Sequence, residues 1–160
     1  KKAESFGIKM ITVHGRTRCQ MFKGQSDWSF IKNVKDEVNI PVIVNGDIIE
    51  SKDVVNSLMC SKADGLMIGR GSYGRPWIFN EMKNLEKKIF KIILKEKKDI
   101  ILQHFEKVLD HYDIEIGIKT FRKHLCWYSK SLDNSNEFRK KINLSLDHRK
   151  VKRYINHFFS

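Results

Sequence analysis

The stretch IPVIVNGD at residues 40–47 decides the fold class of this 160-residue chain. Its first five residues are apolar and mostly β-branched, and they are too few for a buried helix. The run stops at Asn45-Gly46-Asp47, a combination typical of tight turns. We therefore predict a buried strand over residues 40–44, of the kind found in parallel sheets.

The same pattern recurs on both sides of this stretch. Apolar runs at residues 8–13 and 65–68 end at His14-Gly15 and at Gly69-Arg70-Gly71. Helical patterns lie between the runs, one capped by Ser26 and extending to residue 38, the other covering residues 51–59. Parallel strands need such crossovers, which cover the outer face of the sheet. The strand ends are about 31 and 24 residues apart, which suits a (β/α) barrel and a doubly wound sheet equally well.

The remainder of the chain shows a different pattern. Residues 1–6 are predicted to end a helix, so that the chain begins within a domain. Pro76 fits the first turn of a helix, and beyond it we expect only helices, with polar breaks near residues 133–135 and 145–147. The lysine-rich segment 83–98 is predicted to be a solvated connecting helix. These patterns divide the chain into an α/β domain, residues 1–80, and a helical domain, residues 81–160.

Charge is concentrated in the second half. The net charge of +12 comes from 12 basic and 8 acidic residues in 1–80, and from 19 and 11 in 81–160. The second half is therefore the expected contact for a polyanion, although lysine-rich helix faces that only keep a protein soluble are the alternative. No apolar run approaches the roughly 20 residues that span a bilayer. Three widely spaced cysteines without metal-type spacing predict reduced thiols, no metal site and a cytoplasmic location.

The strand ends carry the predicted ligand site. Ligands of parallel α/β proteins bind at this edge, where glycine lets backbone N–H groups approach an anion. Arg70 adds a guanidinium suited to phosphate. Gly69, Gly71 and Gly74 also match a dinucleotide-binding fingerprint, but that fingerprint belongs to a first strand and no later strand follows here. A phosphate site after the last strands is the favoured interpretation.

Five motifs in order make the sequence resemble the tRNA-dihydrouridine synthase family. They are ITVHGRTR at 11–18, DW at 27–28, IPVIVNGDI at 40–48, MIGRG at 67–71 and GRPWIF at 74–79. RKHL at 122–125 and WY at 127–128 are similar to part of the family's helical domain. The resemblance implies that residues 1–80 are the C-terminal part of a TIM (β/α)8 barrel, its last three βα units. A small all-α domain that binds tRNA would follow.

The resemblance also implies an activity. The family holds FMN at the mouth of the barrel, takes electrons from NADPH and reduces specific uridines of tRNA to 5,6-dihydrouridine. The positions that match its cofactor contacts are His14, Asn45, Gly46, Asp47, Gly69 and Arg70. The residues predicted to contact substrate are Arg16, Arg122, Lys123 and His124.

The predicted helix over residues 114–128 would present the tRNA contacts. Its apolar stripe consists of Ile118, Phe121, Leu125 and Tyr128, with Lys119, Lys123 and Lys130 roughly opposite. Cations at residues 122–124 would follow phosphates. Trp127 is interpreted as a core residue rather than a surface on which bases stack. A merely solvated helix face is the alternative.

No catalytic residue is assigned. The family's catalytic cysteine lies on an earlier strand that this chain lacks, and Cys19 follows a different motif. We therefore expect the isolated chain to be inactive and its companion to be the missing N-terminal half of the enzyme. Two other hypotheses remain open: an inactive RNA-binding remnant of a split gene, and another FMN-dependent TIM-barrel oxidoreductase that acts on a small molecule.

Overall fold

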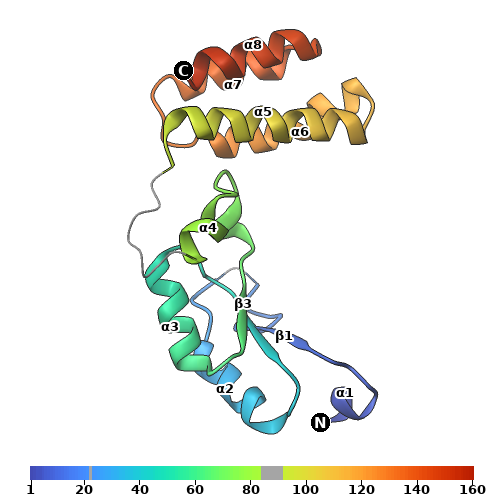
Figure 1. The fold of residues 1–160 in the computed structure, drawn as a ribbon, viewed down its shortest axis with the longest axis vertical. Helices are drawn as coiled ribbons and strands as arrows, with labels where there is room; N and C mark the ends of the chain where they lie inside the picture. The colour runs from blue at the N-terminus through green and yellow to red at the C-terminus, as the bar shows by residue number, and fades with distance from the viewer. Residues whose placement is uncertain (22, 84–91) are drawn as a thin grey trace. The chain divides into compact units, whose positions relative to one another are not determined.

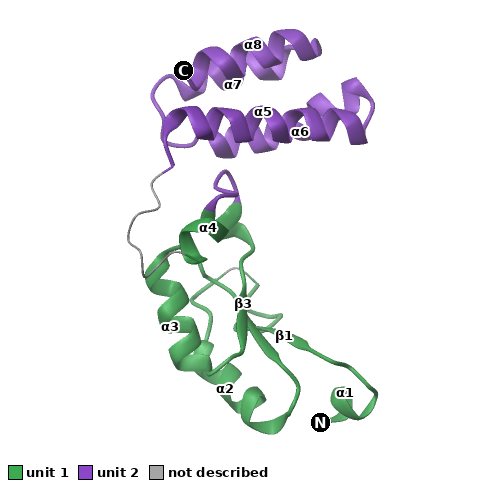
Figure 2. Ribbon diagram, in the orientation of Figure 1, with its two compact units in different colours: residues 1–72, 78–88 green, residues 73–77, 89–160 purple. Residues whose placement is uncertain are grey.

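The computed structural model describes residues 1–21, 23–83 and 92–160, and its chain forms two compact units (Figure 2). The first unit takes the described residues of Lys1–Ser72 and Ile78–Lys88. The second takes Tyr73–Trp77 and the described residues of Ile89–Ser160. A division into domains at residue 80 stays a prediction, and the short segment Tyr73–Trp77 belongs to the second unit although it precedes that residue.

The first unit alternates strands and helices along the chain (Figure 1). Its elements are α1 (Lys2–Ser5), β1 (Ile11–His14), α2 (Trp28–Glu37), β2 (Val42–Asn45), α3 (Ser51–Ser61), β3 (Gly65–Met67), the 3-10 helix η1 (Arg70–Ser72) and α4 (Ile78–Lys83). The three strands form one parallel sheet in the order β1-β2-β3. The predicted parallel sheet is thus confirmed, whereas its closure into a barrel stays a prediction.

The core of the first unit lies where the helices cover the sheet. Val42 and Val44 of β2 are fully buried, because alternate side chains of a strand point to the same face. Ile31 of α2, Val54 of α3 and Ile78 of α4 belong to the same core. The crossover helices therefore supply the apolar cover that a parallel sheet needs.

Two predicted boundaries in the first unit are wrong. Asp27, not Ser26, caps α2, since its carboxylate accepts the N–H of Phe30 at 3.0 Å. The N–H of Ser26 is instead donated to the Asp47 carboxylate at 2.9 Å, which keeps Ser26 in the loop. Pro76 also precedes the helix rather than lying in its first turn, as α4 begins at Ile78.

Helices make up the rest of the described second unit. They are α5 (Leu94–His111), α6 (Ile114–Tyr128), α7 (Ser135–Leu144) and α8 (His148–Phe158). Both predicted polar breaks fall between these helices. Half of the predicted connecting helix over residues 83–98 falls outside the described residues, because 84–91 are not described. None of the helices in the described ranges combines the length and the apolar character needed to cross a membrane.

The segment Tyr73–Trp77 packs against the end of α6. The ring of Tyr73 stacks on Trp127 with a centroid distance of 4.2 Å, and Trp77 stacks on Tyr128 at 6.3 Å. Gly74 has a φ of +69°, and a Cβ there would lie 2.5 Å from the carbonyl oxygen of Trp127. This close approach requires glycine. The stacking gives Trp127 an intramolecular partner for its ring.

Candidate functional site

The parallel register brings the three predicted loops to one edge of the sheet. His14 pairs with Asn45, and Asn45 with Met67, so all three strands end at the same level. The side-chain amide of Asn45 donates to the carbonyl oxygen of Met67 at 2.7 Å. The N–H of Gly15 donates to the Asn45 carbonyl at 3.0 Å. Asn45 therefore ties the loops that follow β1 and β3 to the end of β2.

The turn after β2 has a backbone that only glycine allows at its centre. Gly46 has a φ of +115°, and a Cβ there would lie 2.2 Å from Ser26 Oγ and 3.0 Å from His14 Cε1. The Trp28 indole N–H donates to the Gly46 carbonyl at 2.8 Å. His14 and the turn around Gly46 are thus in direct contact, with the β1–α2 loop folded over them.

An ion pair between Arg16 and Asp47 holds this loop in place. The Arg16 side chain is only 5% exposed, and that of Asp47 is 24% exposed. The guanidinium also donates to the Gly24 carbonyl at 2.7 Å and to Ser26 Oγ at 3.3 Å. The geometry directs these donors to protein groups, and substrate binding by Arg16 stays a prediction.

The charge on Asp47 is stabilised by its surroundings. Burial alone would raise its pKa, but the Ser26 N–H and the Arg16 guanidinium outweigh burial and hold the pKa of Asp47 below its ordinary value. Arg70 approaches the other carboxylate oxygen at 3.5 Å. Two guanidinium groups thus face one carboxylate.

His14 presents one ring nitrogen as a donor. Its Nδ1 accepts the backbone N–H of Arg16 at 3.0 Å. In the neutral ring the proton then resides on Nε2. The side chain is exposed at the end of β1, so Nε2 can donate a hydrogen bond to an acceptor on a ligand.

The loop after β3 combines an open backbone position with an exposed guanidinium. A Cβ built on Gly69 meets no atom within 4 Å, so the backbone there faces open space. The side chain of Arg70 is 50% exposed beside it. An accessible backbone next to a guanidinium is what a phosphate group requires.

A hollow of about 620 Å³ bordered by this ion pair is less suited to phosphate. It is lined by Arg16, Gly24, Gln25, Ser26, Trp28, Asp47, Ile49, Glu50, Lys52 and Asp53. Three carboxylates against two cations give this lining a net negative charge. Phosphate binding at the Gly69 loop stays a prediction.

The three predicted substrate contacts on α6 have different environments. Arg122 is half-buried and donates to the Ser145 carbonyl at 3.2 Å, and Lys123 is exposed. The ring of His124 lies among those of His104, Phe121 and Trp127, at centroid distances of 4.7, 5.5 and 5.1 Å. Of these three residues, only Lys123 presents its charge fully to solvent.

His124 is expected to make the second unit sensitive to acid. Burial and the neighbouring His104 and Lys123 lower the pKa of His124 to about 4, below an unfolded value of about 6.5. The unfolded chain therefore binds the additional proton, and stability falls as the pH drops from about 6.5 towards 4. We expect His124→Phe to reduce this loss in urea denaturation at a series of pH values. The same change at exposed His111 is the control, and an equal reduction there would contradict the assignment.

Sequence reasoning missed the residues that support the site. Ser26 was interpreted as a helix cap and Trp28 was named only within the DW motif, yet both bond to the turn at residues 46–47. The sequence did single out Trp28, because the DW pair at 27–28 is one of the five motifs that resemble the family. The contact itself depends on how the β1–α2 loop folds back, which local patterns do not determine.

Comparison with known proteins identifies the family of this chain. The family model described as "Dihydrouridine synthase (Dus)" matches residues 1–160. A "Probable tRNA-dihydrouridine synthase" of Rickettsia conorii is 47% identical over 100% of this chain and 49% of its own length. The "tRNA-dihydrouridine synthase B" of Pasteurella multocida is 40% identical over 92% of this chain and 45% of its own. The chain spans about half the length of these curated relatives. From the match along its whole length, the chain belongs to the dihydrouridine synthase family.

Proposed function

We propose that this chain provides the flavin-phosphate site and a tRNA-binding unit of an enzyme that reduces uridines of tRNA to 5,6-dihydrouridine. The observation that carries the proposal is the junction of three strand ends, where Asn45, Gly46 and Asp47 meet the open loop at Gly69 and Arg70. FMN bound there and reduced by NADPH would supply the hydride for C6 of the uracil ring.

Each residue of the junction has a role in this proposal. The Gly69 backbone and the Arg70 guanidinium hold the phosphate. Asn45 fixes the distance between β2 and β3 through its bond to the Met67 carbonyl. Arg16 and Asp47 position the β1–α2 loop, and His14 offers Nε2–H to an acceptor on flavin or substrate. We assign no proton donor among residues 1–160.

The tRNA would be held by the basic second half of the chain. A target uridine must leave its base stack to reach a flavin, at a cost of a few kcal/mol. Contacts to tRNA phosphates elsewhere offset this cost. The excess of basic residues over acidic ones in residues 81–160 supplies the charge for such contacts.

The proposal is tested with a chimaera that joins the N-terminal half of the Rickettsia conorii relative to this chain. We expect flavin absorbance and tRNA-dependent formation of dihydrouridine. Combining Arg70→Ala with Asn45→Ala should weaken FMN binding at least tenfold, because each change removes a hydrogen bond near or to a charged group. Isothermal titration with FMN measures the affinity.

The matched control is Arg18→Ala, which removes an exposed arginine from the neighbouring loop. It should leave FMN affinity within about twofold, as expected for a surface change away from the site. Unchanged affinity in the double variant would overturn the flavin assignment. Activity on a small substrate without tRNA would instead favour another flavin-dependent oxidoreductase.

A further inference from the structure

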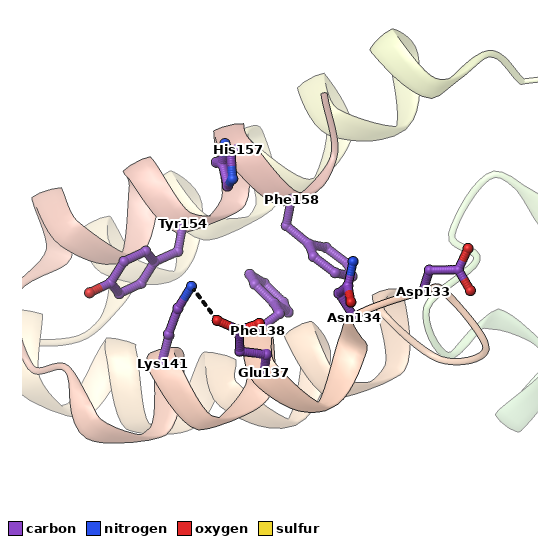
Figure 3. Close-up of a pocket in the computed structure, with 8 residues that line it drawn as sticks. All are labelled: Asp133, Asn134, Glu137, Phe138, Lys141, Tyr154, His157 and Phe158. Carbon is purple, nitrogen blue, oxygen red and sulfur yellow. Dashed lines mark ion pairs between the residues drawn. The ribbon is translucent and has the colours of Figure 1, made fainter.

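A cavity of about 240 Å³ lies between α7 and α8 (Figure 3). Its lining residues are Asp133, Asn134, Glu137, Phe138, Lys141, Tyr154, His157 and Phe158. Three of them are aromatic: Phe138 and Phe158 stack on each other at 4.2 Å, and Tyr154 is half-buried. The others offer hydrogen-bond donors and acceptors. Flat rings with polar edges, such as nucleobases, match this combination.

The polar part of the lining does not suit a phosphate. Asp133 and Glu137 are acidic, whereas Lys141 is the single lysine or arginine of the lining. Glu137 and Lys141 also form an ion pair at 2.9 Å, drawn as a dashed line in Figure 3. The carboxylates suit amino and imino groups of a base better than an anion.

Unpaired cations lie next to the cavity on α8. Lys150 and Arg153 are exposed, and within the described ranges neither forms an ion pair. Residues four apart share a face of a helix. Lys150 is therefore one turn before Tyr154, and Arg153 one turn before His157, both of which line the cavity.

No acidic residue within α8 neutralises Lys150 and Arg153. From His148 to Phe158 the helix contains Arg149, Lys150, Lys152 and Arg153 and no Asp or Glu. Lys152 is paired with Glu106 of α5 at 2.6 Å. Lys150 and Arg153 are thus accessible to an external polyanion, and they lie on the same helix as Tyr154 and Phe158 of the cavity.

We propose that α7 and α8 form a binding site for an unpaired nucleotide of RNA, with the base in the cavity and the adjoining phosphates on Lys150 and Arg153. The identification of this RNA as tRNA rests on the proposed function. The site differs from the α6 surface predicted from sequence, where Arg122 and His124 are turned towards protein groups.

The test uses fluorescence anisotropy to measure how tightly this chain binds a single-stranded RNA octamer and the same octamer in a duplex. We expect at least fivefold tighter binding of the single strand. Tyr154→Leu should weaken it about tenfold, because an aromatic stacking surface is lost, and should leave duplex binding within twofold. His157→Ala, at an exposed position, provides a second cavity variant and should weaken single-strand binding about threefold.

The charge contribution is tested separately. Combining Lys150→Ser with Arg153→Ser should weaken binding of both RNAs. The slope of log affinity against log salt concentration should fall by the amount expected for the loss of about two phosphate contacts. Combining Lys95→Ser with Lys107→Ser removes two exposed lysines from α5 and should change affinity less than twofold. Equal losses in the two pairs would show only general charge attraction and overturn the site. So would equal affinity for single strand and duplex.

The two proposals fail in different ways. If the chimaera reduces tRNA uridines and the α8 and cavity variants bind RNA normally, the nucleotide site is wrong and the proposed function stands. If the variants lose single-strand binding but the chimaera binds no FMN, the nucleotide site stands and the proposed function is wrong.

Discussion

Replacing Arg16 with alanine is expected to lower the free energy of unfolding of the first unit by about 3 kcal/mol. The change removes an almost fully buried guanidinium that donates to Asp47, Gly24 and Ser26. Asp47 would keep the Ser26 N–H but lose its buried cation. A partly buried carboxylate without its cation is costly, and the β1–α2 loop would lose its attachment to β2.

Hydrogen exchange at the Ser26 amide gives a local measurement, since this amide donates to Asp47. Arg18→Ala is the control because Arg18 is exposed two residues further along. It should change the free energy of opening measured at the Ser26 amide by less than about 0.5 kcal/mol. Adding Asp47→Ala to Arg16→Ala should cost less than the sum of the single changes. Additive losses would show that the ion pair does not hold the loop.

The ion pair between Arg16 and Asp47 also sets the pH at which the β1–α2 loop loses its attachment. The folded pKa of Asp47 lies below its ordinary value, so its contribution is complete above about pH 4 and is lost as the pH falls through the folded pKa. Without Arg16 the folded pKa rises towards the ordinary value. The variant should therefore show little further loss of Ser26 protection on acidification.

Periodicity predicted the elements of this chain better than the roles of its polar residues. A run of β-branched residues and the spacing of Ile118, Phe121, Leu125 and Tyr128 each reflect a local geometry. The structure buries all four residues of the helical stripe, but only Val42 and Val44 of the run at 40–44. Such patterns are properties of a single strand or helix. The parallel sheet followed from them because short strands joined by helices have few other arrangements.

The polar side chains depend on contacts that are distant in sequence. The partner of Arg16 is 31 residues away, and Arg122 bonds to a carbonyl 23 residues away. The position of His124 had a usable signal, because it lies three residues from Phe121 and so at the edge of the apolar stripe. The charge count located the basic half of the chain, but only the fold shows which cations remain free.

Ile118→Ala is expected to lower the free energy of unfolding of the second unit by about 3 kcal/mol. Ile118 is 1% exposed and belongs to the core that joins all four helices of this unit. The loss combines the transfer of buried apolar surface with the cavity left among large neighbours such as Phe105 and Phe121. Urea denaturation followed by helical circular dichroism measures it.

The same helix contains a matched control. Ile116 is two residues away and 51% exposed, so Ile116→Ala removes the same atoms from a side chain that already contacts water. It should cost less than about 0.5 kcal/mol. Helix propensity changes equally at the two positions, so the difference isolates burial. Similar losses from the two variants would mean that the apolar stripe of α6 does not face the core. The four helices would then pack differently, and Lys150 and Arg153 of α8 could no longer be assigned as exposed.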